Sequence, residues 1–161
     1  MKKWILVCLV SFLILLYGQS PAQGPAGILV VRIIDGDTIV IASGQKVRLL
    51  GVDTPELHHP NKKVECFAEE AKKFTESQVL NKPVKLTSEG PKQDKYGRLL
   101  AWVWYGEDFK KLLNAEIIRE GYGFSFRKYP TSKLKEFNEL ERIAREKQKG
   151  LWHPDACNGQ R

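Results

Sequence analysis

The segment 47–56 constrains this chain most, because an apolar strand pattern containing Arg48 runs directly into Asp-Thr-Pro-Glu at 53–56. A proline-stiffened turn after a strand fixes the direction of the chain and places two carboxylates at the strand end. Upstream, Asp35-Gly36-Asp37 adds two carboxylates at a predicted hairpin turn, and downstream Asp94-Lys95-Tyr96-Gly97-Arg98 adds a second arginine. Carboxylates and arginines at three strand ends predict a site for a metal ion and a phosphate.

These three motifs together resemble the staphylococcal nuclease (thermonuclease) family, and the resemblance extends from about Gly27 to Trp152. Each motif alone also occurs as an ordinary hairpin turn, a strand exit with a helix cap, or an exposed turn. Their occurrence in this order, each at a strand end, is what carries the resemblance.

The strand and helix patterns indicate an α+β fold with a mainly antiparallel sheet. Runs rich in β-branched residues predict five strands at 28–34, 38–41, 47–52, 83–88 and 99–105. Apolar residues at helical spacing predict three helices at about 65–80, 114–120 and 132–149, with Gly121 ending the second. The resemblance implies that the five strands close into an OB-fold β-barrel with the first helix inserted between strands three and four. We expect this domain to span residues 27–158.

The N-terminus indicates export. Lys2 and Lys3 precede an apolar run from Trp4 to Tyr17, which is short for a membrane span of about 20 residues. We therefore interpret residues 1–22 as a signal peptide and the protein as secreted or associated with the cell envelope, with an uncleaved N-terminal anchor as the alternative. Removal of this segment takes two of the 26 Lys and Arg residues and none of the 19 acidic ones, which leaves a net charge of +5. A basic surface favours polyanionic partners such as nucleic acid.

Two cysteines follow the predicted signal peptide, Cys66 and Cys157. In an exported chain an even pair is expected to form a disulfide bond, with two free thiols as the alternative. A zinc site is not expected, because neither cysteine has neighbouring residues at the spacing of zinc ligands.

Phosphodiester hydrolysis needs phosphate neutralisation, an activated water and stabilisation of the charge that develops on oxygen. Carboxylate oxygens of Asp35 and Asp53 favour a hard cation such as Ca²⁺ or Mg²⁺. The resemblance implies that the ion is Ca²⁺ and that both aspartates and the Thr54 backbone carbonyl hold it. Glu56 is expected to act as the general base or to orient the attacking water.

Arg48 and Arg98 are the expected phosphate clamp, because a guanidinium donates two parallel hydrogen bonds and stays charged near neutral pH. The resemblance also implies that Arg98 stabilises the transition state and the leaving group. Asp37 is either an orienting carboxylate or an ordinary turn residue. His58 and His59 follow the acidic loop and are expected to be surface residues rather than catalytic ones.

Four further residues are expected to bind substrate. Lys95 and Tyr96 match family positions that contact the terminal phosphate and the sugar or base. Phe124 and Phe126 align with two aromatic positions that are tyrosines in the staphylococcal enzyme, and core packing is the competing interpretation for both.

The sequence thus predicts a Ca²⁺-dependent, sugar-nonspecific nuclease, acting on DNA and RNA and leaving 3′-phosphates. The cleavage position and the lack of sugar selectivity are implied by the resemblance. Single strands are the preferred substrate, because an OB groove with aromatic platforms accepts unstacked bases. We expect a monomer without stable membrane association. The alternative is a noncatalytic OB-fold module that binds single-stranded nucleic acid, although such a module has no use for Asp35, Asp53 and Glu56 beside a phosphate site.

Overall fold

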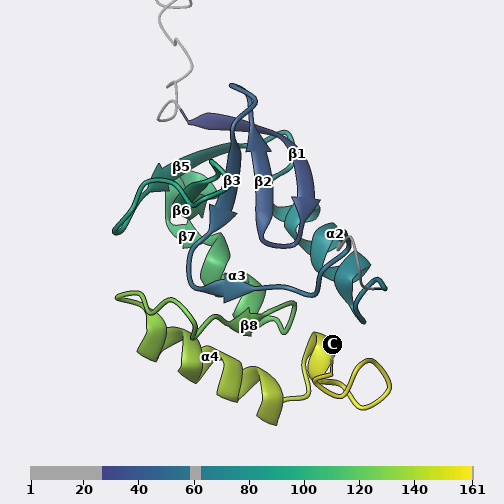
Figure 1. Cartoon of the computed structure of the whole chain (residues 1–161). Helices are drawn as coiled ribbons and strands as arrows, with labels where there is room; N and C mark the ends of the chain where they lie inside the picture. The colour runs from purple at the N-terminus through teal and green to yellow at the C-terminus, as the bar shows by residue number, and fades with distance from the viewer. Residues whose placement is uncertain (1–26, 59–62, 161) are drawn as a thin grey trace, which may run out of the picture.

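The computed structural model describes residues 27–58 and 63–160, which form an α+β structure (Figure 1). The predicted signal peptide at 1–22 and His59 lie outside these residues. In chain order the elements are β1 (Ile28–Asp35), β2 (Thr38–Ile41), β3 (Lys46–Leu49), β4 (Val52–Asp53), α2 (Ala68–Val79), β5 (Pro83–Thr87), β6 (Leu99–Tyr105), the 3₁₀ turn η2 (Glu107–Phe109), β7 (Lys111–Leu112), α3 (Leu113–Arg119), β8 (Phe124–Ser125), α4 (Leu134–Glu146) and the 3₁₀ turn η3 (Gly150–Trp152).

Five strands close into a barrel in the order β3-β2-β1-β5-β6. The neighbours in this order pair antiparallel, and a parallel pairing of β3 with β6 completes the ring, with Val47 opposite Leu99 and Leu49 opposite Ala101. Between β3 and β5 the chain forms α2, which contacts β1. The expected five-stranded barrel with a helix between its third and fourth strands is therefore confirmed.

The strand predicted at 47–52 is in fact two strands. β3 ends at Leu49, the chain turns through Gly51 at φ 69°, and β4 then pairs with β8 instead of continuing along the barrel. A Cβ on Gly51 would lie 3.0 Å from the Phe137 ring of α4, so this turn and α4 pack closely. The turn directs Val52–Asp53 away from the barrel wall and toward the hairpin turn between β1 and β2.

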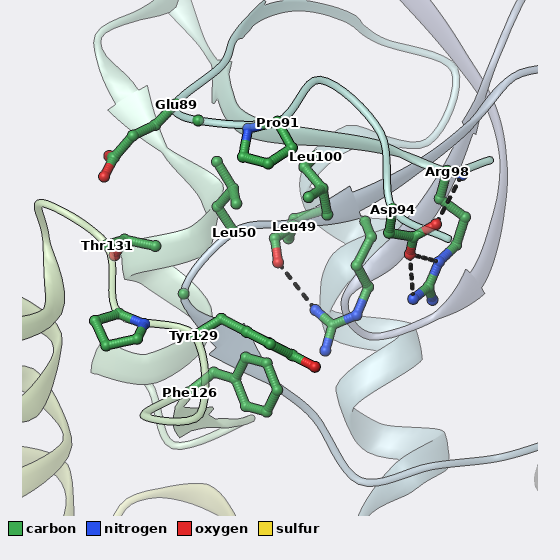
Figure 2. A pocket seen from close by; sticks show the side chains of 14 residues that line it. Leu49, Leu50, Glu89, Pro91, Asp94, Arg98, Leu100, Phe126, Tyr129 and Thr131 are labelled. Carbon is green, nitrogen blue, oxygen red and sulfur yellow. Dashed lines mark hydrogen bonds and ion pairs between the residues drawn. The ribbon is translucent and has the colours of Figure 1, made fainter. Parts of the chain in front are cut away.

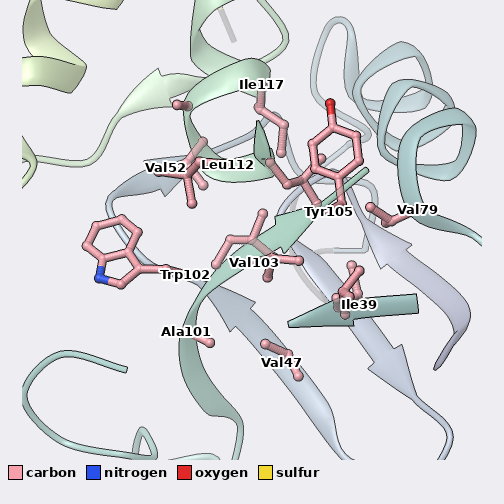
Figure 3. Close-up of a cluster of buried hydrophobic side chains, with 14 of the residues drawn as sticks. Ile39, Val47, Val52, Val79, Ala101, Trp102, Val103, Tyr105, Leu112 and Ile117 are labelled. Carbon is pink, nitrogen blue, oxygen red and sulfur yellow. The ribbon is translucent and has the colours of Figure 1, made fainter. Parts of the chain in front are cut away.

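The core fills the barrel and extends toward α3 and α4 (Figure 3). Inward residues of the strands, such as Ile39, Val47 and Val103, are almost fully buried. Phe137 of α4 is fully buried and its ring meets that of Trp102 edge-on, with centroids 5.7 Å apart. The apolar stripe of α4 therefore faces inward, against α3 and Trp102, as predicted. The charged residues of α4 are exposed except Glu141, which is buried and accepts a hydrogen bond from the Ser125 backbone N–H.

A second, smaller cluster lies at the C-terminal end of the fold, made of Ala144, Leu151, Trp152 and Cys157. Next to it a disulfide bond joins Cys66, just before α2, to Cys157, 91 residues later. The expected cysteine pairing is therefore found. Among the helices of the described residues, none combines the length and apolar character needed to cross a membrane.

Candidate active site

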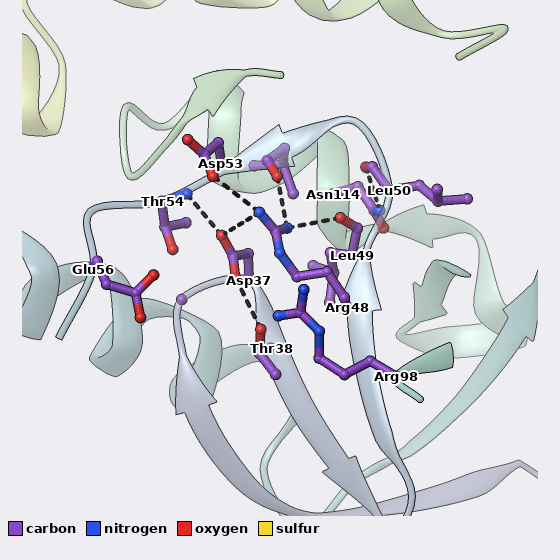
Figure 4. Close-up of polar contacts among 12 residues, drawn as sticks. Asp37, Thr38, Arg48, Leu49, Leu50, Asp53, Thr54, Glu56, Arg98 and Asn114 are labelled. Atoms are coloured by element: carbon purple, nitrogen blue, oxygen red, sulfur yellow. Dashed lines mark hydrogen bonds and ion pairs between the residues drawn. The ribbon is translucent and has the colours of Figure 1, made fainter. Parts of the chain in front are cut away.

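Arg48 is the centre of the polar cluster that the three motifs form (Figure 4). Its Nη2 lies 3.1 Å from Asp37 Oδ2 and 3.0 Å from Asp53 Oδ1. Its Nη1 donates to the backbone carbonyls of Leu49 and Val52, at 2.9 and 2.7 Å. Because β3 ends one residue after Arg48, the turn at Gly51 brings the chain back so that these carbonyls and Asp53 surround its guanidinium. The sequence predicted that Arg48 and Asp53 share a site, and the structure brings them into contact.

Asp37 is a more central member of this cluster than the sequence indicated. Its Oδ2 accepts a 2.9 Å hydrogen bond from the Thr54 backbone N–H, and its Oδ1 accepts one of 3.0 Å from the Thr38 hydroxyl. Asp37 thus connects the β1–β2 turn to the Asp-Thr-Pro-Glu segment. Asp35, two residues earlier, is also buried but faces His58, with 3.4 Å between Asp35 Oδ1 and His58 Nδ1. Both turn carboxylates belong to the site, and Asp37 is the one that lies beside Asp53 and Thr54.

Glu56 is only partly exposed, and its side chain points toward Asp37 in Figure 4. Burial raises the pKa of Glu56 above its ordinary value, and the nearby negative charges of Asp35 and Asp37 raise it further, against the opposing effect of Arg48. The Glu56 backbone N–H donates to Glu65 Oε2 at 3.0 Å, which fixes the loop that carries it. A carboxylate with a raised pKa accepts a proton more readily than an ordinary one, which suits a general base.

The donor chemistry of the cluster fits a hard divalent cation. Asp35, Asp37, Asp53 and Glu56 supply carboxylate oxygens in one region, and oxygen donors are those that Ca²⁺ and Mg²⁺ prefer. The buried Thr54 Oγ1 has no hydrogen-bond partner in the part of the chain that the structure describes, so a polar donor is left over at this point. Across residues 27–58 and 63–160, no three His, Cys, Asp or Glu side chains are already drawn together as a ligand cage. The cluster thus has the right donors, and a cation would draw them closer.

Gly36 keeps the carboxylate turn close to its neighbours. A Cβ at this position would lie 2.8 Å from Thr54 Cγ2 and 2.9 Å from Ala71 Cβ of α2. The Gly36 carbonyl accepts a 2.6 Å hydrogen bond from the buried Thr75 hydroxyl of α2. The helix therefore positions the turn that carries Asp35 and Asp37.

Arg98 is held by Asp94 at the start of the turn that precedes β6. Arg98 Nε and Nη2 each lie 2.7 Å from Asp94 Oδ2, and Asp94 Oδ1 accepts hydrogen bonds from the Tyr96 and Arg98 backbone N–H groups. Burial acts to raise the pKa of Asp94, but its hydrogen bonds with Arg98 and with these backbone groups outweigh that effect and lower it. Asp94 was not among the predicted site residues, and only its position four residues before Arg98 could have indicated this role.

Arg48 and Arg98 line one pocket of about 290 Å³ (Figure 2). Leu49, Leu50 and Leu100 form part of its wall, and Phe126 and Tyr129 form another part, with their rings edge-on at 5.7 Å. The Arg48 guanidinium carbon lies 5.8 Å from the centre of the Phe126 ring. Apolar walls, two aromatic rings and two cations together can accept a nucleobase and its phosphate.

The predicted substrate-binding residues divide into three groups. Phe126 lines the pocket, as expected. Phe124 does not; its ring packs edge-on against Trp152 at 5.1 Å, beside the C-terminal cluster, so the core-packing interpretation describes it. Lys95 and Tyr96 lie in the neighbouring turn, where Tyr96 is exposed and the Lys95 and Arg98 cations lie 5.0 and 5.5 Å from its ring. Tyr129, which was not predicted as a site residue, lines the pocket instead of Phe124. Its position before Pro130, in the loop ahead of α4, was the only sequence signal that could have indicated this.

Comparison with known proteins gives an independent finding. The family described as "Staphylococcal nuclease homologue" matches residues 46–154. A thermonuclease of Staphylococcus intermedius is 32% identical over 162 residues, which cover 92% of this chain and 95% of the relative. A thermonuclease of Staphylococcus hyicus is 35% identical over 127 residues, covering 76% of this chain and 73% of the relative. Protein ParB of Escherichia coli is 31% identical over 160 residues, covering 94% of this chain and 86% of the relative.

Proposed function

This chain belongs to the staphylococcal nuclease family, and from that premise we propose that it hydrolyses phosphodiester bonds in DNA and RNA with the help of Ca²⁺. The observation that carries the proposal is the pocket that Arg48 and Arg98 share, because Arg48 also contacts Asp37 and Asp53 of the carboxylate cluster. A phosphate held by the two arginines lies next to carboxylates that can bind a cation and accept a proton.

Asp35, Asp37 and Asp53, with Thr54, are the residues that would hold the cation. When bound, Ca²⁺ supplies positive charge that offsets the phosphate and the carboxylates and polarises the phosphoryl oxygen. The involvement of Asp37 is supported by its hydrogen bond to Thr54 and its shared partner Arg48. Asp35, the predicted ligand from the same turn, remains a proposed member of the set.

The two arginines bind the scissile phosphate from one side. Each guanidinium can donate two N–H groups in a planar fork to phosphate oxygens, and these hydrogen bonds strengthen as negative charge grows on those oxygens. Arg98 keeps its orientation through Asp94, so little reorganisation is needed when the phosphate binds. We assign to Arg98 the stabilisation of the transition state and of the leaving oxygen.

Glu56 is the general base of the proposed reaction. Its raised pKa makes it a better proton acceptor, and its position near Asp35, Asp37 and Arg48 supports this role. It takes one proton from the attacking water as the P–O bond forms. The bond to the 5′ oxygen then breaks, and the leaving oxygen takes up a proton from solvent water while Glu56 returns its proton to solvent, which leaves a 3′-phosphate and a 5′-hydroxyl product.

Single strands are the proposed substrate form. The pocket presents Phe126 and Tyr129 as aromatic surfaces, and a base must leave its stack to reach them. Since contacts to phosphate and to a base face do not read the 2′-hydroxyl, both DNA and RNA are accepted. Export of the protein is part of the same proposal, supported by the Cys66–Cys157 disulfide, which an oxidising compartment preserves.

The test is digestion of single-stranded DNA and RNA by the purified protein, once with added Ca²⁺ and once with a chelator. We expect both substrates to be cleaved only with Ca²⁺, and end-group analysis to find 3′-phosphates. Binding of both nucleic acids without any cleavage would identify the rival function, a noncatalytic binding module. Cleavage that is unchanged in chelator would overturn the metal assignment.

A further inference from the structure

A second concave surface lies beside the active site, and most of its lining residues come from β1 and α2. These two elements lie side by side (Figure 1). This groove has a volume of about 550 Å³ and is lined by Val31, Arg32, Ile33, Ile34, Lys46, His58, Lys72, Glu76 and Leu80. We call it the β1–α2 groove. His58 belongs to it and also lies 3.4 Å from Asp35 of the carboxylate cluster, so the groove begins at the edge of the active site.

Three cations give the groove its charge. Arg32 lies opposite Val40 on β2, and Val40 lies opposite Lys46 on β3, so Arg32 and Lys46 share one face of the sheet. Lys72 comes from the α2 side. Within residues 27–58 and 63–160 none of the three forms an ion pair within 4.0 Å. Glu76 is the one carboxylate among the lining residues, so the groove is net positive.

Local backbone geometry exposes Arg32. The pairing of β1 with β2 shifts register between Val30 and Arg32, so one extra residue is accommodated there and both Val31 and Arg32 face outward. By contrast, several arginines elsewhere on the surface are neutralised by nearby glutamates, such as Arg142 by Glu139 and Glu146. Arg32, Lys46 and Lys72, which form no ion pair within the described residues, thus line one concave surface at the edge of the active site.

We propose that the β1–α2 groove binds the sugar-phosphate backbone of a nucleic acid strand that continues beyond the scissile phosphate. This proposal rests on the proposed nuclease function. A strand with one base in the Phe126–Tyr129 pocket and its phosphate at Arg48 and Arg98 passes the carboxylate cluster and enters the groove at His58. No Phe, Tyr or Trp lines the groove in the described part of the chain, so it offers cations for phosphates and no stacking platform for bases. It therefore adds affinity for longer strands without sequence preference.

The shape of the groove favours a strand over an anionic lipid surface. Binding to a bilayer surface requires protruding apolar side chains that enter the acyl region. Among the apolar lining residues Ile33 is buried, Ile34 and Leu80 are partly exposed, and only Val31 is exposed, so the groove offers little protruding apolar surface to a bilayer.

The test compares two triple variants that each remove three positive charges. The groove variant is Arg32→Gln, Lys46→Gln and Lys72→Gln, and the control is Lys73→Gln, Lys135→Gln and Lys147→Gln, three exposed lysines that do not line the groove. Affinity for a single-stranded oligonucleotide of about twelve nucleotides, within the site size of one OB-fold, is measured in chelator across a salt series. Cleavage of a trinucleotide is measured as kcat/KM with Ca²⁺.

For the groove variant we expect a loss of about tenfold or more in affinity for the longer strand at low salt, and a decrease of about 2 in the salt slope, as three lost phosphate contacts require. Trinucleotide cleavage is expected to stay unchanged. Glu76→Gln, which removes the one opposing charge, is expected to tighten binding of the longer strand. Equal affinities of the groove variant and the control variant would overturn the proposal, and so would equal losses for short and long substrates.

Two further outcomes separate this proposal from its premise. If the parent protein cleaves no trinucleotide but the groove variant alone loses affinity for the longer strand, the proposed catalysis fails and the groove stands. If the groove variant loses binding to vesicles of phosphatidylserine and phosphatidylcholine while keeping its oligonucleotide affinity, the groove is a lipid contact and the proposal is wrong.

Discussion

The two arginines of the phosphate clamp are held in different ways, and this difference predicts different roles. Arg48 donates to two carboxylates and two backbone carbonyls, so its removal would disturb the Asp37–Asp53 cluster as well as phosphate binding. Arg98 is paired with Asp94 in a turn outside that cluster. Substitution of Arg98 is therefore the cleaner test of transition-state stabilisation.

Arg98→Ala is expected to lower kcat by about a hundredfold or more while changing the affinity for a single-stranded oligonucleotide only modestly, with affinity measured in chelator. Arg98→Lys should restore little, because it keeps the charge but loses the planar fork. Arg142→Ala on α4 is the control, since Arg142 is also paired with carboxylates but lies away from the site. An Arg98→Ala protein that cleaves as fast as the parent would place the active site elsewhere.

Glu56→Gln tests the raised pKa of Glu56 in the metal-free protein. Because this pKa lies above 4.5, the folded state binds the proton more tightly than the unfolded state, and the free energy of unfolding falls as pH rises from 4.5 through the raised value. Glutamine carries no charge and avoids this loss. In chelator we expect Glu56→Gln to have a higher Tm than the parent at neutral pH and an equal Tm well below pH 4.5, and with Ca²⁺ to lose catalysis by about a hundredfold or more. A Tm difference that does not vary with pH would contradict the assignment.

At the scale of elements, the β1–β2 turn and α2 act as one unit. Thr75 donates to the Gly36 carbonyl, and Ala71 leaves no room for a side chain at Gly36. The positions of Asp35 and Asp37 thus depend on a helix that contributes no proposed ligand itself.

Gly36→Ala should therefore force the turn and α2 apart. Since the new Cβ would lie 2.8–2.9 Å from Thr54 and Ala71, we expect a loss of about 1–3 kcal/mol in the free energy of unfolding. We also expect weaker Ca²⁺ binding, measured by calorimetry. Ser43→Ala, in the exposed turn after β2, is the control and should change neither quantity appreciably. Retention of parental stability and Ca²⁺ affinity in Gly36→Ala would show that the turn tolerates the extra atom.

The sequence predicted elements well where one pattern extended over many residues. The β2 and β6 bounds match the predicted 38–41 and 99–105, and α3 lies one residue from its predicted start and end, followed by Gly121 at φ 77°. The predicted strand at 47–52 was wrong at Gly51. The apolar run 47–52 has the pattern of a single strand, and the turn at Gly51 is explained only by the Phe137 ring that packs against it. The two-residue strands β4, β7 and β8 carry no periodicity and form only through their partners.

The same distinction applies to the site. The residue types of Arg48, Asp53, Glu56 and Arg98 follow from motifs, but which carboxylate of the 35–37 turn lies beside Asp53 depends on how β1 and β2 sit against β4. Asp37 is that carboxylate because its Oδ2 reaches Thr54 and Arg48. Phe124 and Phe126 are two residues apart and would share a face if β8 continued. β8 ends at Ser125, however, so Phe126 lies beyond the strand and lines the pocket, whereas Phe124 packs against Trp152.

At the scale of the whole molecule, the Cys66–Cys157 bond joins the start of α2 to the C-terminal cluster. Replacing both cysteines by serine is expected to lower the free energy of unfolding by about 4 kcal/mol, the loop-closure contribution for a loop of this length. Denaturant titration should give the same midpoint for this variant and for the parent in reductant. Identical midpoints for the oxidised parent and the double variant would show that the bond does not stabilise the fold.

The parallel pairing of β3 with β6 sets the order of events when the chain folds. Arg48 lies opposite Leu100 across this seam and Arg98 directly precedes β6, so the seam is what brings the two arginines to one pocket. Contacts between residues about fifty positions apart form late, because the loop entropy is lost before the contact contributes. In refolding experiments, nuclease activity should therefore return with the slowest phase of tryptophan fluorescence and lag behind the helical circular dichroism signal. Activity that appears with the earliest helical signal would mean that the two arginines come together before the barrel closes. If activity instead returns last, a partly folded chain has no nuclease activity.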